Sequence, residues 1–111
     1  MKNYYAHIWL DDVRIPNFIG SEKAILFWVM DYDNFVGAVK QVKEKISDCC
    51  VHFDHDLGEN SKDGYECAKF LVNWCIENGY DVPDYEIHSA NPVGRQNIES
   101  VFATYQKVKS M

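Results

Sequence analysis

Short apolar runs and longer apolar stripes alternate along this chain. Runs rich in aromatic and β-forming residues predict four strands, at residues 5–10, 24–30, 49–53 and 85–88. Apolar residues repeated every three or four positions are typical of amphipathic helices. Such stripes predict three helices: one along Phe35, Val39, Val42 and Ile46, one from about Gly64 to Asn78, and one from the region of Ile98 to near the C-terminus.

Capping residues mark the ends of these helices. The segment from Asp31 to Asn34 supplies capping side chains before the first stripe. Gly79 stands where a left-handed C-cap belongs, and Pro83 indicates that the second helix has ended. Asn91 before Pro92 predicts the start of the third helix, with Asn as the cap and Pro in the first helical position.

The order of elements, ββαβαβα, predicts the fold class. Helices that alternate with strands indicate an α/β three-layer sandwich, here with a mainly parallel four-stranded sheet and about three helices. At 111 residues the chain has the size of one domain, which we expect to cover residues 1–111. The 47% hydrophobic and 25% charged composition is ordinary for a globular domain.

The net charge argues against one class of binding partner, nucleic acid bound along an extended surface. Seventeen acidic against eleven basic residues give a formal charge of −6, which argues against an extended nucleic-acid surface because such surfaces need clustered Lys and Arg. A small phosphate-bearing ligand held at one site is compatible with this charge. No apolar run approaches the roughly 20 residues of a membrane span, and the first residues lack the apolar core of a signal peptide. We therefore expect a cytoplasmic protein without a membrane partner.

Two further features concern association and redox chemistry. The apolar run at 24–30 could form an exposed sheet edge that pairs with another chain, so an oligomer stays open. The four cysteines lack the spacing of a zinc site, and we expect reduced thiols that act as small core residues. They are Cys49, Cys50, Cys67 and Cys75.

Polar clusters follow three of the predicted strands. Asp11 and Asp12 follow the first strand, Asp54-His55-Asp56 follows the third, and the fourth gives way to His88-Ser89-Ala90-Asn91. In parallel sheets with right-handed crossovers, the C-terminal ends of the strands meet at one edge, where ligands bind. We therefore expect these three clusters to converge on one site.

A divalent cation would resolve the repulsion between the converging carboxylates. Mg²⁺ favours one or two carboxylates, waters and a phosphate oxygen as ligands. Mn²⁺ is also possible, because the neighbouring histidines could add nitrogen ligands. The predicted metal ligands are Asp11, Asp12, Asp54 and Asp56. The alternative for each aspartate is that it caps a neighbouring turn.

Histidines and a helix start supply the remaining candidate chemistry. His55 and His88 titrate near neutral pH and could move a proton, whereas His7 and His52 lie inside strands and are interpreted as structural. Ser89, Asn91 and the amides near Gly94 lie at a helix N-terminus, which suits an anion. Two arginines are further candidates for phosphate contact: Arg95, which could grip two oxygens, and Arg14, which could equally be a surface residue.

Three motifs resemble the cyclic-phosphate-processing receiver-like domains, small bacterial and phage relatives of response-regulator receivers. The motifs are Leu10-Asp11-Asp12-Val13-Arg14-Ile15-Pro16, Phe53-Asp54-His55-Asp56-Leu57-Gly58 and His88-Ser89-Ala90-Asn91-Pro92-Val93-Gly94-Arg95. The resemblance implies a truncated receiver-like (flavodoxin-like) fold. It also implies that Asp11, Asp12 and Asp54 match the Mg²⁺-binding positions of receivers, and that Ser89 matches their hydroxyl residue.

The chain also departs from ordinary receivers. No fifth strand with its lysine follows the last helix, the segment between the first two strands is a loop, and His55 and His88 are foreign to a plain receiver. These departures weigh against phospho-signalling, and Arg95 could replace the lysine's charge. The resemblance implies processing of a cyclic phosphate, on an RNA 2′,3′-cyclic end or in a cyclic nucleotide, by a metal-dependent phosphoesterase.

Alternatives stay open within and outside the enzyme class. Asp54 could hold the metal only, or it could attack phosphorus as a covalent nucleophile. Outside the enzyme class, the domain could bind or sequester a nucleotide without turnover, or accept a phosphoryl group as a signalling module.

Overall fold

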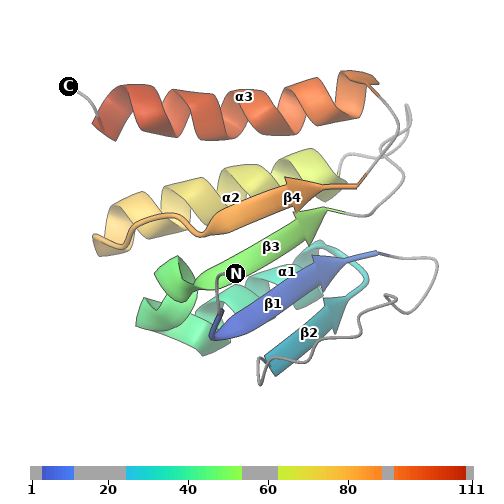
Figure 1. The fold of residues 1–111 in the computed structure, drawn as a ribbon, viewed down its shortest axis with the longest axis vertical. Helices are drawn as coiled ribbons and strands as arrows, with labels where there is room; N and C mark the ends of the chain where they lie inside the picture. Colours follow the sequence, from blue (N-terminus) through green and yellow to red (C-terminus); the bar gives the residue numbers. More distant parts are fainter. Residues whose placement is uncertain (1–3, 12–24, 54–62, 89–91, 110–111) are drawn as a thin grey trace.

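The computed structural model describes residues 4–11, 25–53, 63–88 and 92–109, with the side chains of residues 63, 108 and 109 left aside (Figure 1). Four strands form one sheet, and every neighbouring pair in it is parallel. The strands are β1 (Ala6–Leu10), β2 (Ile25–Val29), β3 (Cys49–Phe53) and β4 (Asp84–Ile87), in the spatial order β2-β1-β3-β4. The helices are α1 (Tyr32–Val42), α2 (Asp63–Asn78) and α3 (Pro92–Lys109), with a 3₁₀-helix, η1 (Lys43–Asp48), after α1.

This architecture confirms the predicted truncated receiver-like α/β fold, with its parallel four-stranded sheet and three helices. Within the described ranges, all three helices lie on the same face of the sheet, α1 and α2 behind the strands and α3 beyond β4 (Figure 1). The opposite face carries no helix among these residues. The predicted second helical layer of the sandwich, on the opposite face of the sheet, is therefore not seen among the described residues.

The helix ends that the structure describes follow the prediction with one exception, and the predicted cap Asn91 lies outside the described residues. Asp31 caps α1 by accepting a hydrogen bond from the Asn34 amide at 2.8 Å. Gly79 has a φ of 74°, the left-handed conformation that a C-cap glycine adopts. The apolar stripe predicted α-helix as far as Ile46, but α1 ends at Val42 because Lys43 takes a φ of 52°. Ile46 stays in the core through the 3₁₀ turn that follows.

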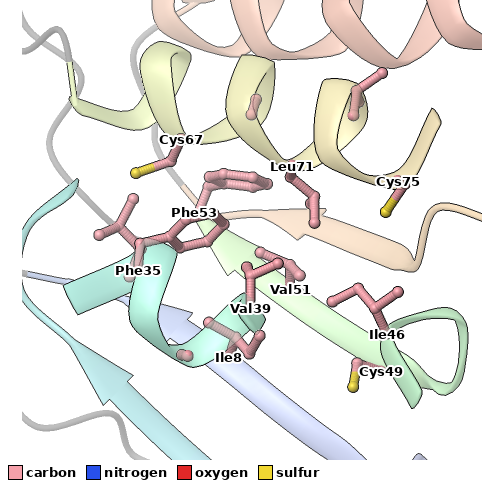
Figure 2. Close-up of a cluster of buried hydrophobic side chains, with 14 of the residues drawn as sticks. Ile8, Phe35, Val39, Ile46, Cys49, Val51, Phe53, Cys67, Leu71 and Cys75 are labelled. Atoms are coloured by element: carbon pink, nitrogen blue, oxygen red, sulfur yellow. The ribbon is translucent and has the colours of Figure 1, made fainter. Parts of the chain in front are cut away.

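The core fills the space between the sheet and the helices. Ile8, Val51 and Phe53 point from the strands toward α1 and α2, as Figure 2 shows. The Phe53 side chain is fully buried, with the ring of Phe35 at 6.3 Å and that of Phe102 edge-on at 6.2 Å between centroids. All four cysteines are buried free thiols, as predicted. Cys49, Cys67 and Cys75 belong to this core, whereas Cys50 is buried on the opposite face of the sheet, beside Glu86.

Strand alternation gives the sheet two chemically different faces. Ile8, Val51 and Tyr85 are paired across β1, β3 and β4 and face the helices. The next residue along each strand (Trp9, His52 and Glu86) is paired in the same way and faces the opposite side. One face therefore carries the core, and the other carries aromatic and titratable side chains.

Candidate functional site

The C-terminal ends of three strands meet at one edge of the sheet, as the sequence predicts. Leu10 at the end of β1 is paired with Phe53 at the end of β3, and Phe53 is paired with Ile87 at the end of β4. The His88 amide continues this pairing by donating to the Phe53 carbonyl at 3.0 Å. The residues that follow β1 and β4, Asp11 and His88, therefore leave the sheet at this common edge.

Asp11 is held firmly at the end of β1. Its amide donates to the Val29 carbonyl at 3.1 Å, and its own carbonyl accepts from Trp28 Nε1 at 2.9 Å. The residue is only 1% exposed. Burial of a carboxylate is costly unless another group compensates its charge. A buried carboxylate oxygen at the ligand-binding edge of a parallel sheet fits the donor chemistry of Mg²⁺.

Arg95 brings a positive charge to the same edge. It lies in the first turns of α3, and its Nη1 donates to the Ile87 carbonyl at 2.8 Å. Its Nη2 lies 3.6 Å from Glu99 Oε1, one turn further along the helix. Gly94 is buried in the first turn of α3, beside Arg95. The structure thus brings Asp11, His88 and Arg95 to one end of the sheet.

The other predicted site residues lie outside the described ranges. They are Asp12, Arg14, Asp54, His55, Asp56, Ser89 and Asn91. Described elements nevertheless border two of these residues. β3 ends at Phe53, one residue before Asp54, and α3 begins at Pro92, one residue after Asn91. The roles of these residues stay predictions.

Three histidines form a hydrogen-bonded row on the sheet face opposite the helices. His7 Nδ1 lies 2.9 Å from His52 Nε2, and His52 Nδ1 lies 3.1 Å from His88 Nε2. Glu86 adds a carboxylate, with Oε2 3.4 Å from His52 Nδ1. A carboxylate only accepts, so it favours the tautomer of His52 that carries its hydrogen on Nδ1. His52 Nε2 then accepts from His7 Nδ1.

The indole ring of Trp9 packs beneath two imidazoles of this row. The His52 ring stacks on it at 4.2 Å between centroids and 11° between planes, and the His88 ring does so at 5.1 Å and 8°. The two imidazoles lie within 13° of parallel to each other. The indole therefore holds the rings of His52 and His88 in nearly the same orientation.

Burial sets the protonation of two groups on this face. Burial, together with the neighbouring His7 and His88, lowers the pKa of His52 to about 3. Burial also raises the pKa of Cys50 to about 12, with the carboxylates of Glu86 and Asp84 acting in the same direction. At neutral pH, His52 is therefore a neutral imidazole and Cys50 a protonated thiol.

Sequence reasoning missed the link between the three histidines. It interpreted His7 and His52 as separate structural residues and His88 as a residue of the strand-end site. The signal that could have found the row is the two-residue alternation within each strand. Because Ile8 and Val51 face the core, His7 and His52 must both face the other side. The pairing of β3 with β4 then supplies His88.

Comparison with known proteins identifies the family. The family model described as the cyclic-phosphate processing receiver domain matches residues 6–104, which is most of the chain. No curated protein and no solved structure matches. The chain therefore belongs to the cyclic-phosphate processing receiver domain family, and the resemblance seen in its three motifs is confirmed. Among the described residues, no helix has both the length and the hydropathy needed to cross a membrane.

Proposed function

We propose that this member of the cyclic-phosphate processing receiver domain family is a metal-dependent phosphoesterase that opens a cyclic phosphodiester. The substrate would be an RNA 2′,3′-cyclic phosphate end or a cyclic nucleotide. The observation that carries the proposal is that a residue with a buried carboxylate, one with an imidazole and one with a guanidinium all lie at the same strand-end edge of the sheet, in a domain from this family. They are Asp11, His88 and Arg95.

The metal would be Mg²⁺ or Mn²⁺, held by Asp11 together with Asp12 and Asp54, with Asp56 as a further ligand or orienting group. Carboxylate oxygens are the donors that these hard cations prefer. When bound, such a cation polarises a phosphoryl oxygen and lowers the pKa of a bound water. The position of Asp11 at the end of β1 supports this assignment, because a buried carboxylate at the ligand-binding edge of a parallel sheet offers a cation a donor oxygen.

The reaction adds one water across a P–O bond. The water oxygen attacks phosphorus, the bond from phosphorus to one ribose oxygen breaks, and that oxygen leaves with a proton. His55 or His88 would deliver this proton as general acid. Asp54 would act as a metal ligand in this scheme, and as the attacking group if a covalent intermediate forms.

Arg95 would stabilise the charge that develops on the phosphoryl oxygens. Its guanidinium donates one hydrogen bond to the Ile87 carbonyl and presents 46% of its side chain to solvent, so further N–H groups remain for a phosphate. Ser89 and Asn91, which precede α3, would add neutral donors, and Arg14 would add a second cation. Charged donors positioned before the reaction are effective because they need no reorganisation.

A substrate panel tests this proposal. The protein is incubated with 2′,3′-cyclic mononucleotides, 3′,5′-cyclic nucleotides and RNA ending in a 2′,3′-cyclic phosphate, with Mg²⁺, with Mn²⁺ and with EDTA. We expect ring opening of at least one class, lost in EDTA and in Asp11→Asn. Trapping of an aspartyl-phosphate at Asp54 would assign the covalent route. Stoichiometric binding of a nucleotide that stays intact over hours would instead identify a sequestering module and overturn the enzymatic proposal.

A further inference from the structure

The exposed end of the histidine row brings three metal-ligating atoms together. His52 Nδ1 lies 3.1 Å from His88 Nε2 and 3.4 Å from Glu86 Oε2. Each of the three residues offers one ligand atom that lies within 4.8 Å of those of the other two. In a tetrahedral zinc site with bonds of about 2.0–2.1 Å, neighbouring donor atoms lie roughly 3.3–3.4 Å apart. Two of the three separations already match this spacing to within about 0.3 Å.

The sheet fixes these ligands on a rigid base. His52 and Glu86 are directly paired across β3 and β4, so their side chains leave the same face side by side. Trp9 stacks against both imidazoles and holds them nearly parallel. His88 and Glu86 are exposed, so a cation can reach the site and the two side chains can turn toward it. Ligands that project from packed strands make more precise sites than ligands on loops.

His7 provides the outer support that a ligating histidine needs. An imidazole that binds metal through one nitrogen almost always donates a hydrogen bond through the other. With His52 Nδ1 bound to a cation, its hydrogen moves to Nε2, which lies 2.9 Å from His7 Nδ1. None of the four strands contains a lysine or an arginine, and Glu86 contributes a negative charge. The local charge of the sheet therefore favours a cation.

We propose that His52 Nδ1, Glu86 Oε2 and His88 Nε2 form a zinc-binding site on the sheet face opposite the helices, with a fourth position open to water. Two imidazoles and one carboxylate suit Zn²⁺, whereas the aspartate cluster at the strand ends suits Mg²⁺. This site goes beyond the proposed phosphoesterase function and does not depend on it, although it uses His88, one of the two candidates for the general acid of that reaction.

Calorimetric titration of Zn²⁺ into the EDTA-stripped full chain tests the site, with Mg²⁺ in excess to occupy the aspartate cluster. We expect one equivalent to bind. Glu86→Gln and His88→Gln should each weaken binding at least tenfold while keeping the far-ultraviolet circular dichroism of the parent. Glu66→Gln, an exposed change on α2, is the matched control and should bind like the parent. Asp54→Asn should also bind like the parent, which separates this site from the proposed phosphoesterase centre.

Cobalt substitution tests the ligand set. Co²⁺ should give visible bands without a thiolate-to-metal charge-transfer band, because Cys50 is not among the three ligands. Such a band, lost in Cys50→Ser, would place the ion in the buried group His7, Cys50 and His52 and overturn the assignment. The proposal also fails if no equivalent of Zn²⁺ binds, or if binding is unchanged in both Glu86→Gln and His88→Gln.

Discussion

The buried imidazole of His52 should make the protein sensitive to mild acid. Its pKa is lowered to about 3 in the folded chain, against an ordinary value of about 6.5 in the unfolded chain. Between these values the unfolded state binds a proton that the folded state does not. Stability contributed by the neutral ring is therefore fully present above about pH 6.5 and is lost as the pH falls toward 3.

The size of this effect follows from linkage. One group with these two pKa values removes about 2 kcal/mol from the free energy of unfolding between pH 7 and pH 5. The residue is only 4% exposed, so solvent does little to screen the charge. Urea denaturation at pH 7 and pH 5, in EDTA to exclude metals, measures the loss directly.

A variant isolates the contribution of His52 from that of the carboxylates. His52→Gln should lose about 2 kcal/mol less than the parent between the two pH values, because the carboxylate background is common to both proteins. NMR titration of the His52 ring in the parent gives an independent measure. Titration of that ring near pH 6.5, or equal losses in the parent and the variant, would refute the reasoning.

Three further changes give distinct results. Arg95→Gln should lower kcat/KM for the cyclic substrate about 10- to 100-fold, because a charged hydrogen bond contributes roughly 1.5–3 kcal/mol. Steady-state kinetics checks this, with Lys69→Gln as the surface-charge control. An unchanged kcat/KM in Arg95→Gln would show that Arg95 does not contribute to the site. Phe53→Ala should lower the free energy of unfolding by about 3–5 kcal/mol, since the ring is fully buried between Phe35 of α1 and Phe102 of α3. A loss below about 1 kcal/mol in urea denaturation would contradict this description of the core. Asp31→Ala should cost about 1 kcal/mol by removing the α1 cap, whereas Asp31→Asn should cost less because it can still accept from the Asn34 amide.

Local sequence signals predicted most of the fold. The apolar runs located every strand to within one residue at either end, and Gly79 and Pro92 marked a helix end and a helix start correctly. The early end of α1 could not be predicted, because the apolar stripe continues through Lys43 to Ile46. Ile46 stays buried in the 3₁₀-helix that follows, so the burial pattern gives no sign of the change from α-helix to 3₁₀-helix.

The strand-end site could be predicted because it depends only on topology. The residues that follow parallel strands lie at one edge of the sheet. Topology alone therefore predicts that Asp11, His88 and Arg95 lie at the same edge. The histidine row depends on register, which a single sequence does not give. Alternation places His7 and His52 on one face, but only the pairing of β1 with β3 and of β3 with β4 reveals that His7, His52 and His88 lie next to one another there.

The most direct test of the central claim is hydrolysis followed by phosphorus NMR. The protein is mixed with a 2′,3′-cyclic mononucleotide and Mg²⁺, and the cyclic resonance is followed beside Asp11→Asn and Asp54→Asn. The account predicts conversion to a phosphomonoester by the parent and loss of that conversion in both variants and in EDTA. If the parent leaves this substrate, the 3′,5′-cyclic nucleotides and a cyclic RNA end unchanged in either Mg²⁺ or Mn²⁺, or if both variants convert as fast as the parent, the account is contradicted.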